Sequence, residues 1–166
     1  MRPMIFVLST TLVLVAAAAA GDGTASGTMT VKATTTRMAY AYAMSTSNPF
    51  DKAKPALRLV LSDVALTPKV LADNSPFALQ DLMRAGKLHA IEAIVSVDDK
   101  SVLGTQMYDP KFEMSSVSVA GTNIKLDVKT LDKTTFAGKL YTEKPDDFNK
   151  VPFEYAITFS APITTK

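Results

Sequence analysis

Apolar and polar residues alternate with a period of two along most of the chain after residue 28. The longest such segment is 153–161, in which Phe153, Tyr155 and Ile157 fall on one face. The shorter alternating segments are 29–33, 38–44, 57–61, 91–97, 102–108, 117–119, 124–128 and 136–141. Successive side chains of a β-strand point to opposite faces, so this pattern predicts about eight or nine strands, each with one buried and one solvent-facing side.

One segment follows a helical period instead. Ser75 can cap a helix whose first residue is Pro76, and Gly86 is suited to end it. The apolar residues between them share one helical face: Leu79, Leu82 and Met83. The sequence therefore predicts one short helix near 76–86, between two strands.

Strands that follow one another through short turns pair antiparallel. The sequence thus predicts a mainly β fold, an antiparallel β-sandwich with a small β-barrel as the alternative. A single β-rich domain is expected over residues 28–166. The turn-rich stretch 45–55 and the polar stretch around 145–147 are expected to be loops.

The first 20 residues have the features of a secretory signal peptide. Arg2 is followed by an apolar segment over 4–15, and Ala18 and Ala20 take the −3 and −1 positions before Gly21. The apolar segment is short for a membrane span, which needs about 20 apolar residues. We therefore expect a cleaved signal peptide over 1–20, a flexible leader over 21–27, and a periplasmic or secreted protein.

Composition and charge narrow the chemistry that the chain can perform. Its 166 residues include no cysteine, which excludes thiol catalysis, thiolate metal sites and disulfides. The 18 basic and 16 acidic residues are scattered along the chain, so a nucleic-acid partner is not expected. No later segment has the length of a membrane span, and neither a phosphate loop nor a dinucleotide fingerprint is present. We therefore expect no cofactor and no membrane span after signal cleavage.

Three short patterns resemble a group of small exported bacterial proteins of uncharacterised function. They are Gly27-x-Met29-x-Val31 leading to Ala39-Tyr40-Ala41, the strand Leu59-x-Leu61-Ser62-Asp63, and the ending Phe159-Ser160-Ala161-Pro162. The resemblance covers most of the chain after the signal peptide. It implies a bacterial envelope or secreted setting and assigns no catalytic residue.

His89 is the only histidine, and it lies where the predicted helix gives way to a strand. A Ser-His-Asp arrangement would have to use it, with Asp63, Asp98 or another acid as the orienting residue. The more economical interpretation is a polar residue at a strand start that makes a backbone hydrogen bond. We accordingly assign no catalytic and no metal-ligating residue. A small hydrolase or isomerase using His89 stays as one alternative, and copper or zinc handling through His89 and the methionines as another.

Tyr40 and Tyr42 form a row with Met38 and Met44, with alanines between them. If this row is exposed, it is an adhesive amphipathic patch; if it is buried, it is core. The hypothesis that we carry forward is an exported, non-enzymatic binding or interaction module. Its partner would be a protein or a small-molecule ligand, and its candidate binding residues are Tyr40, Tyr42, Asp63 and His89.

Overall fold

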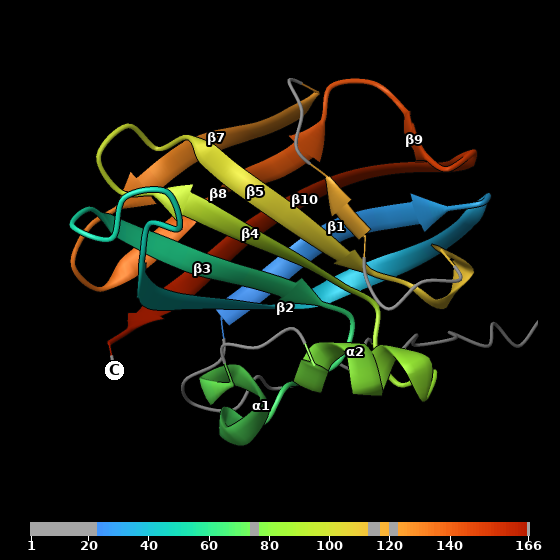
Figure 1. The fold of residues 1–166 in the computed structure, drawn as a ribbon, viewed down its shortest axis with the longest axis horizontal. Helices are drawn as coiled ribbons and strands as arrows, with labels where there is room; N and C mark the ends of the chain where they lie inside the picture. The colour runs from blue at the N-terminus through green and yellow to red at the C-terminus, as the bar shows by residue number, and fades with distance from the viewer. Residues whose placement is uncertain (1–22, 74–76, 113–116, 120–122, 166) are drawn as a thin grey trace, which may run out of the picture.

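The computed structural model describes residues 23–73, 77–112, 117–119 and 123–165. Within these ranges the chain forms ten strands, two short α-helices and one 3-10 turn (Figure 1). The strands are β1 Gly23–Val31, β2 Thr34–Ser47, β3 Pro55–Ser62, β4 Ala90–Ser96, β5 Val102–Tyr108, β6 Val117–Val119, β7 Ile124–Leu131, β8 Thr135–Thr142, β9 Asp146–Phe148 and β10 Val151–Thr164. The helices are α1 Pro68–Ala72 and α2 Phe77–Arg84, and the 3-10 turn is Pro110–Phe112. The predicted signal peptide and the predicted cap Ser75-Pro76 lie outside the described residues.

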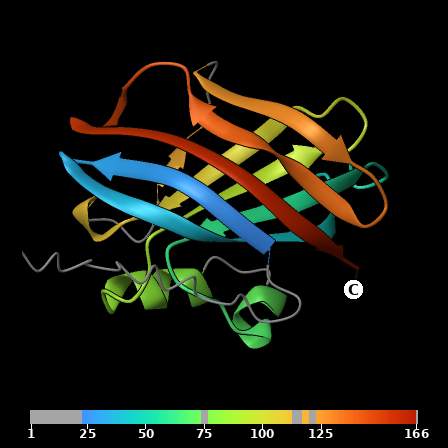
Figure 2. The same cartoon turned by 180° about the vertical axis from the view of Figure 1, so that it is seen from behind.

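The strands belong to one continuous sheet in the order β6-β5-β4-β3-β2-β1-β10-β8-β7, with β9 on the side of β10. Neighbours along this path pair antiparallel. The sheet curls into a half-barrel, so that β3, β4 and β5 lie in front in Figure 1, and β1, β10, β8 and β7 in front in Figure 2. The predicted mainly β, antiparallel fold is confirmed. The curled sheet combines the two facing layers of a sandwich with the curvature of a barrel.

The main core fills the inside of the curl. Alternate residues of every long strand point into it, and β10 shows the strict alternation that the sequence predicts. The largest completely buried side chains of this core include Met29, Leu59, Ile91, Phe136 and Ile157. The rings of Phe136 and Phe159 meet edge to face with their centroids 5.0 Å apart. The interior is therefore packed with apolar side chains.

A second core lies on the outer side of the sheet, between β2–β5 and the helices. It contains Tyr42, Val60, Leu79, Met83 and Tyr108. Because this core covers its outer face, β3 is buried on both sides, which corrects the expectation that one side of each strand faces water. Among the described residues, no helix is long and apolar enough to cross a membrane.

Helix α2 confirms the predicted helix, and its end is the predicted one. Gly86 has a φ of +65°, its N–H donates to the carbonyl of Met83 at 2.9 Å, and Lys87 N–H donates to the carbonyl of Leu82. Helix α1 was not predicted. It is one turn long, begins at a proline and is capped by the Thr67 hydroxyl, so it has no apolar repeat for a sequence pattern to reveal.

The chain start differs from its prediction. Residues 23–27, expected in a flexible leader, form the beginning of β1 and pair with β10 on one side and β2 on the other. Glycine is needed here, because a Cβ on Gly23 would lie 2.5 Å from the carbonyl oxygen of Ser160. The small and polar residues at 23–27 therefore belong to a central strand whose backbone packs closely against its neighbours. Strand β9 is also new, in a stretch expected to be a loop.

Candidate functional site

Two of the predicted site residues, Asp63 and His89, lie side by side. Asp63 follows the end of β3 and His89 precedes β4, and these strands pair antiparallel. The N–H of Asp63 donates to the carbonyl of His89 at 3.1 Å, and the N–H of His89 donates to Asp63 Oδ1 at 2.9 Å. His89 Nδ1 lies 2.8 Å from Asp63 Oδ2. The predicted backbone hydrogen bond of His89 is present, and its ring is also oriented by a carboxylate.

Asp109, which the sequence analysis did not single out, lies on the other side of the same ring. Its side chain is only 3% exposed, Oδ1 accepts the N–H of Lys111 at 2.8 Å, and Oδ2 lies 3.9 Å from His89 Nε2. If Nδ1 donates to Asp63, Nε2 is the proton acceptor of the neutral ring and faces Asp109. The arrangement can therefore exchange a proton at Nε2, in a side chain that is 26% exposed.

The same geometry does not collect metal ligands at one point. The carboxylates of Asp63 and Asp109 contact opposite nitrogens of the ring, so their oxygens do not converge beside it. In the part of the chain that the structure describes, no group of three or more His, Cys, Asp or Glu side chains could hold a metal ion.

Tyr40 and Tyr42 do not form an exposed patch. Tyr42 is buried in the second core, and its hydroxyl accepts the N–H of Leu66 at 2.9 Å. Tyr40 is half-buried and packs against the same core. Met38 belongs to the main core, because the pairing of β1 with β2 shifts register between residues 24 and 27. The row predicted from the alternation is therefore broken, and most of it is core.

A buried ion pair lies beneath α1. The guanidinium of Arg58 donates through Nη2 to Glu92 Oε2 at 2.9 Å, and through Nη1 to the carbonyls of Leu71 and Asp73 at 3.1 and 2.9 Å. Tyr108 donates its hydroxyl to Gln106 and approaches Glu92 Oε2 at 3.4 Å; burial and the charge of Glu92 raise the pKa of Tyr108 well above its usual range. These contacts hold α1 against the sheet, so their first role is structural.

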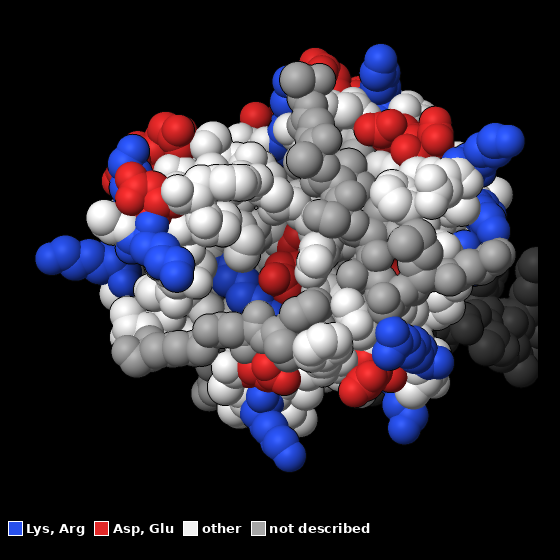
Figure 3. Space-filling model, viewed as in Figure 1, with Lys and Arg blue, Asp and Glu red and all other residues white. Residues whose placement is uncertain are grey.

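Charged side chains on the face seen in Figure 1 gather mostly at its periphery. Figure 3 shows acidic and basic side chains around the rim, and charged atoms of both signs in a hollow near the centre. The rest of the drawn surface on this face is mostly uncharged. No extended basic stripe crosses this face in the part that the structure describes, in keeping with the scattered charges of the sequence.

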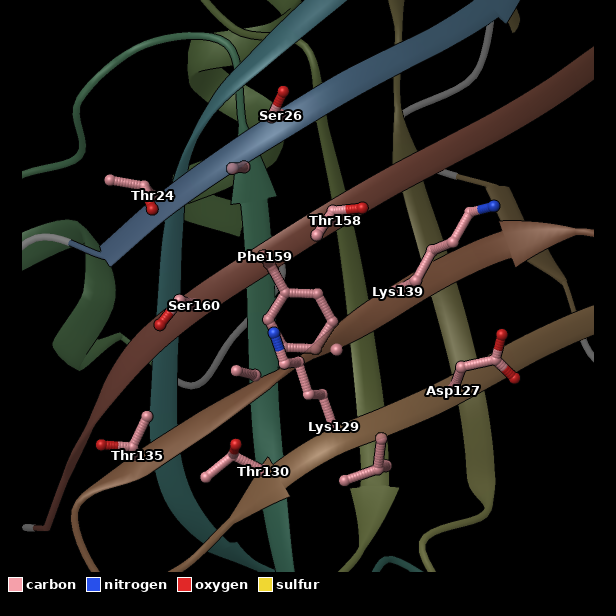
Figure 4. A pocket seen from close by; sticks show the side chains of 14 residues that line it. Thr24, Ser26, Asp127, Lys129, Thr130, Thr135, Lys139, Thr158, Phe159 and Ser160 are labelled. Carbon is pink, nitrogen blue, oxygen red and sulfur yellow. The ribbon is translucent and has the colours of Figure 1, made fainter.

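A groove of about 610 Å³ lies on the outer side of β1, β10, β8 and β7 (Figure 4). Its floor is made of short side chains in register across neighbouring strands: Thr24 is opposite Ser160, and Ser26 is opposite Thr158. Ala137 of β8 continues the first of these rows. Helices cover the outer side of β2–β5, whereas no described helix covers this part of the outer side.

Three charged side chains border the groove on the side of β7 and β8. Lys139 is directly opposite Asp127 in the strand pairing, and its Nζ lies 4.8 Å from the centre of the Tyr141 ring. Lys129 is exposed and forms no ion pair with a described residue. With two lysines and one aspartate, the bordering side chains carry a formal charge of 2 − 1 = +1. The groove thus joins a hydroxyl-rich floor to a weakly basic border.

This groove was not predicted from the sequence, because Thr24 and Ser26 fall in the stretch expected to be a flexible leader. No family model, no curated protein and no solved structure matches the chain. The resemblance to small exported bacterial proteins therefore stays a prediction.

Proposed function

We propose that this protein is a non-enzymatic binding protein and that the groove on the outer side of β1, β10, β8 and β7 is its ligand site. The observation that carries the proposal is the groove itself, about 610 Å³ in volume and lined by hydroxyl-bearing, charged and mostly small apolar residues. Ligand sites are concave and present a few well-placed polar groups. Among the described residues, the interior of the curled sheet is packed with apolar core side chains and offers no comparable set of polar groups.

We further propose that the protein is exported. This rests on the sequence of residues 1–20, with its basic start, apolar segment and small residues before Gly21. Mass spectrometry of the protein purified from the envelope fraction of its host tests it. Loss of the first 20 residues or so is expected, and a full-length mass would contradict export by cleavage.

The binding proposal is tested by blocking the groove. Ser26 and Thr34 are both exposed hydroxyl residues on neighbouring strands, but only Ser26 lines the groove. A Ser26→Arg variant places a long side chain on the floor, and Thr34→Arg adds the same charge elsewhere. NMR titration with the oligosaccharides described below should show shifts on the groove strands that Ser26→Arg abolishes and Thr34→Arg preserves. Equal effects of both variants would remove the groove as the site.

A second candidate function is acid–base catalysis by His89, favoured by the 2.8 Å contact between its Nδ1 and Asp63. The probe is hydrolysis of p-nitrophenyl acetate. His89→Gln should abolish any activity above background, while Asp63→Asn should lower kcat and leave KM nearly unchanged, because Asp63 only positions the ring. Activity that survives His89→Gln would exclude this candidate.

A further inference from the structure

We infer that the groove binds an acidic polysaccharide, a chain of sugars that carry carboxylates. This inference rests on the proposed binding function and adds the class of ligand. It follows from three properties of the groove: the lattice of hydroxyls on its floor, the charge on its border, and the paired backbone beneath it.

The floor presents hydroxyls in a regular arrangement. Thr24 and Ser160 form one cross-strand pair, and Ser26 and Thr158 form the next pair along β1 and β10. Neighbouring strands lie about 4.8 Å apart, and alternate residues of one strand about 6.8 Å apart, so the four hydroxyls occupy a grid of these dimensions. Each hydroxyl can donate one hydrogen bond and accept two. Such a grid matches a ligand that is itself dense in hydroxyls.

The border supplies the attraction that a hydroxyl grid lacks. Hydrogen bonds to exposed hydroxyls compete with water and contribute little net free energy. The groove has one aromatic lining residue, Phe159, whose side chain is buried in the main core and offers no face on which a sugar could stack. Lys129 forms no ion pair with a described residue, and Lys139 is held over Tyr141 with its charge on the groove side of β8. The net charge of +1 on the border therefore favours a ligand that carries negative charge.

The backbone argues against an extended peptide as the occupant. Peptides that bind sheets usually add a strand to a free edge and bond to its backbone. The groove lies on the face of the sheet, and both β10 and β8 are paired on each side along its length. Apart from Gly138, the residues that line the groove carry side chains, which suits a polymer recognised through its substituents. Its width of four strands, about 14 Å, accommodates a short run of sugars.

The experiment is isothermal titration of the exported protein with pentagalacturonate, neutral maltopentaose and a glutamate pentapeptide. Pentagalacturonate should bind, more weakly as salt is raised, and the other two should bind at least tenfold more weakly. Lys129→Ala and Lys139→Ala should each weaken binding about fivefold. The matched control is Lys133→Ala, an exposed lysine in the β7–β8 turn that does not line the groove.

Each other outcome overturns the inference in a distinguishable way. If maltopentaose binds as tightly and Ser26→Arg blocks it, the groove is a binding site but the acidic class is wrong. If the glutamate peptide binds as tightly, charge alone governs the site and polysaccharide recognition is refuted. If sulfated dextran pentasaccharide binds at least tenfold more tightly than pentagalacturonate, the anionic group is sulfate and the carboxylate assignment falls. If none of the probes binds, both the inference and the proposed groove function are rejected.

Discussion

Replacing Arg58 by methionine should be among the most damaging single changes on the outer side of the sheet. The Arg58 and Glu92 side chains are only 5% and 14% exposed. Removal of the guanidinium therefore leaves the Glu92 carboxylate buried without its cationic partner. It also removes Nη1, which donates to the carbonyls of Leu71 in α1 and of Asp73 just after it. Breaking a buried ion pair from one side costs about 3–5 kcal/mol. This is a large share of the 5–15 kcal/mol by which domains of this size are usually stable.

The pair itself should contribute much less than this loss. Desolvation offsets most of the attraction between two buried charges, and Arg58 Nε is buried without a hydrogen-bond partner among the described residues. The double variant Arg58→Met/Glu92→Leu should therefore recover most of the stability. We expect it to lie within about 1–2 kcal/mol of the natural protein, the remainder reflecting the hydrogen bonds from Arg58 that the carbonyls of Leu71 and Asp73 lose.

Urea denaturation at pH 7, followed by far-ultraviolet circular dichroism, measures these differences. Lys54→Met is the matched control, because its ion pair with Asp51 spans 3.9 Å and both side chains are at least half exposed. That variant should lose less than about 1 kcal/mol. If Arg58→Met were no more destabilising than Lys54→Met, or if the double variant were worse than the single one, the reasoning would be refuted.

Two further predictions concern the strands and a turn. A Cβ on Gly138 would lie 2.3 Å from a backbone oxygen of β7, whereas one on Gly104 would meet nothing within 4 Å. In urea denaturation, Gly138→Ala should therefore lower the free energy of unfolding by about 1–3 kcal/mol, and Gly104→Ala by less than about 0.5 kcal/mol. Equal effects would refute the close approach of β7 and β8. Hydrogen bonds from Ser96 and Ser101 lower the pKa of Asp99 from 3.8 to about 2. Its stabilising contribution is present above pH 4 and lost as the pH falls through 2, so an NMR titration midpoint at 3.8 would contradict the structure.

Period-two alternation was enough to place nearly every strand, because a strand against a core must bury every second side chain. The alternation does not show what covers the opposite face of each strand. In β3, Arg58 and Val60 alternate with leucines as residues of a wet face would, yet both are buried. The cover is α2 and the one-turn α1, the second of which has no periodic signal. The pattern of one strand therefore predicts its own inner face and leaves the outer one to tertiary structure.

The contact between Asp63 and His89 could have been predicted from the sequence. Both residues were singled out, and antiparallel pairing of the strands on either side of the helix places them opposite each other once Ser62 pairs with Ala90. Asp109 could not be predicted as a member of this site, because its position depends on the register of β5 against β4. That register shifts by one residue near Ile94. Local patterns fix which residues face inward, whereas contacts across several strands depend on registers that a single sequence does not display.

The groove depends on strand order to an even greater degree. Its strands β1, β10, β8 and β7 are neighbours in space, although β1 and β10 lie at opposite ends of the described chain. Composition still marks the difference between the two halves of the outer side. Outward positions of β2–β5 include Tyr42, Val60 and Tyr108, which the helices cover, whereas those of β1 and β10 include Ser26 and Thr158, which are exposed. Apolar outward residues require a cover, and hydroxyl-bearing ones do not. The half of the sheet without helices is therefore the half whose side chains are free to meet a polar ligand.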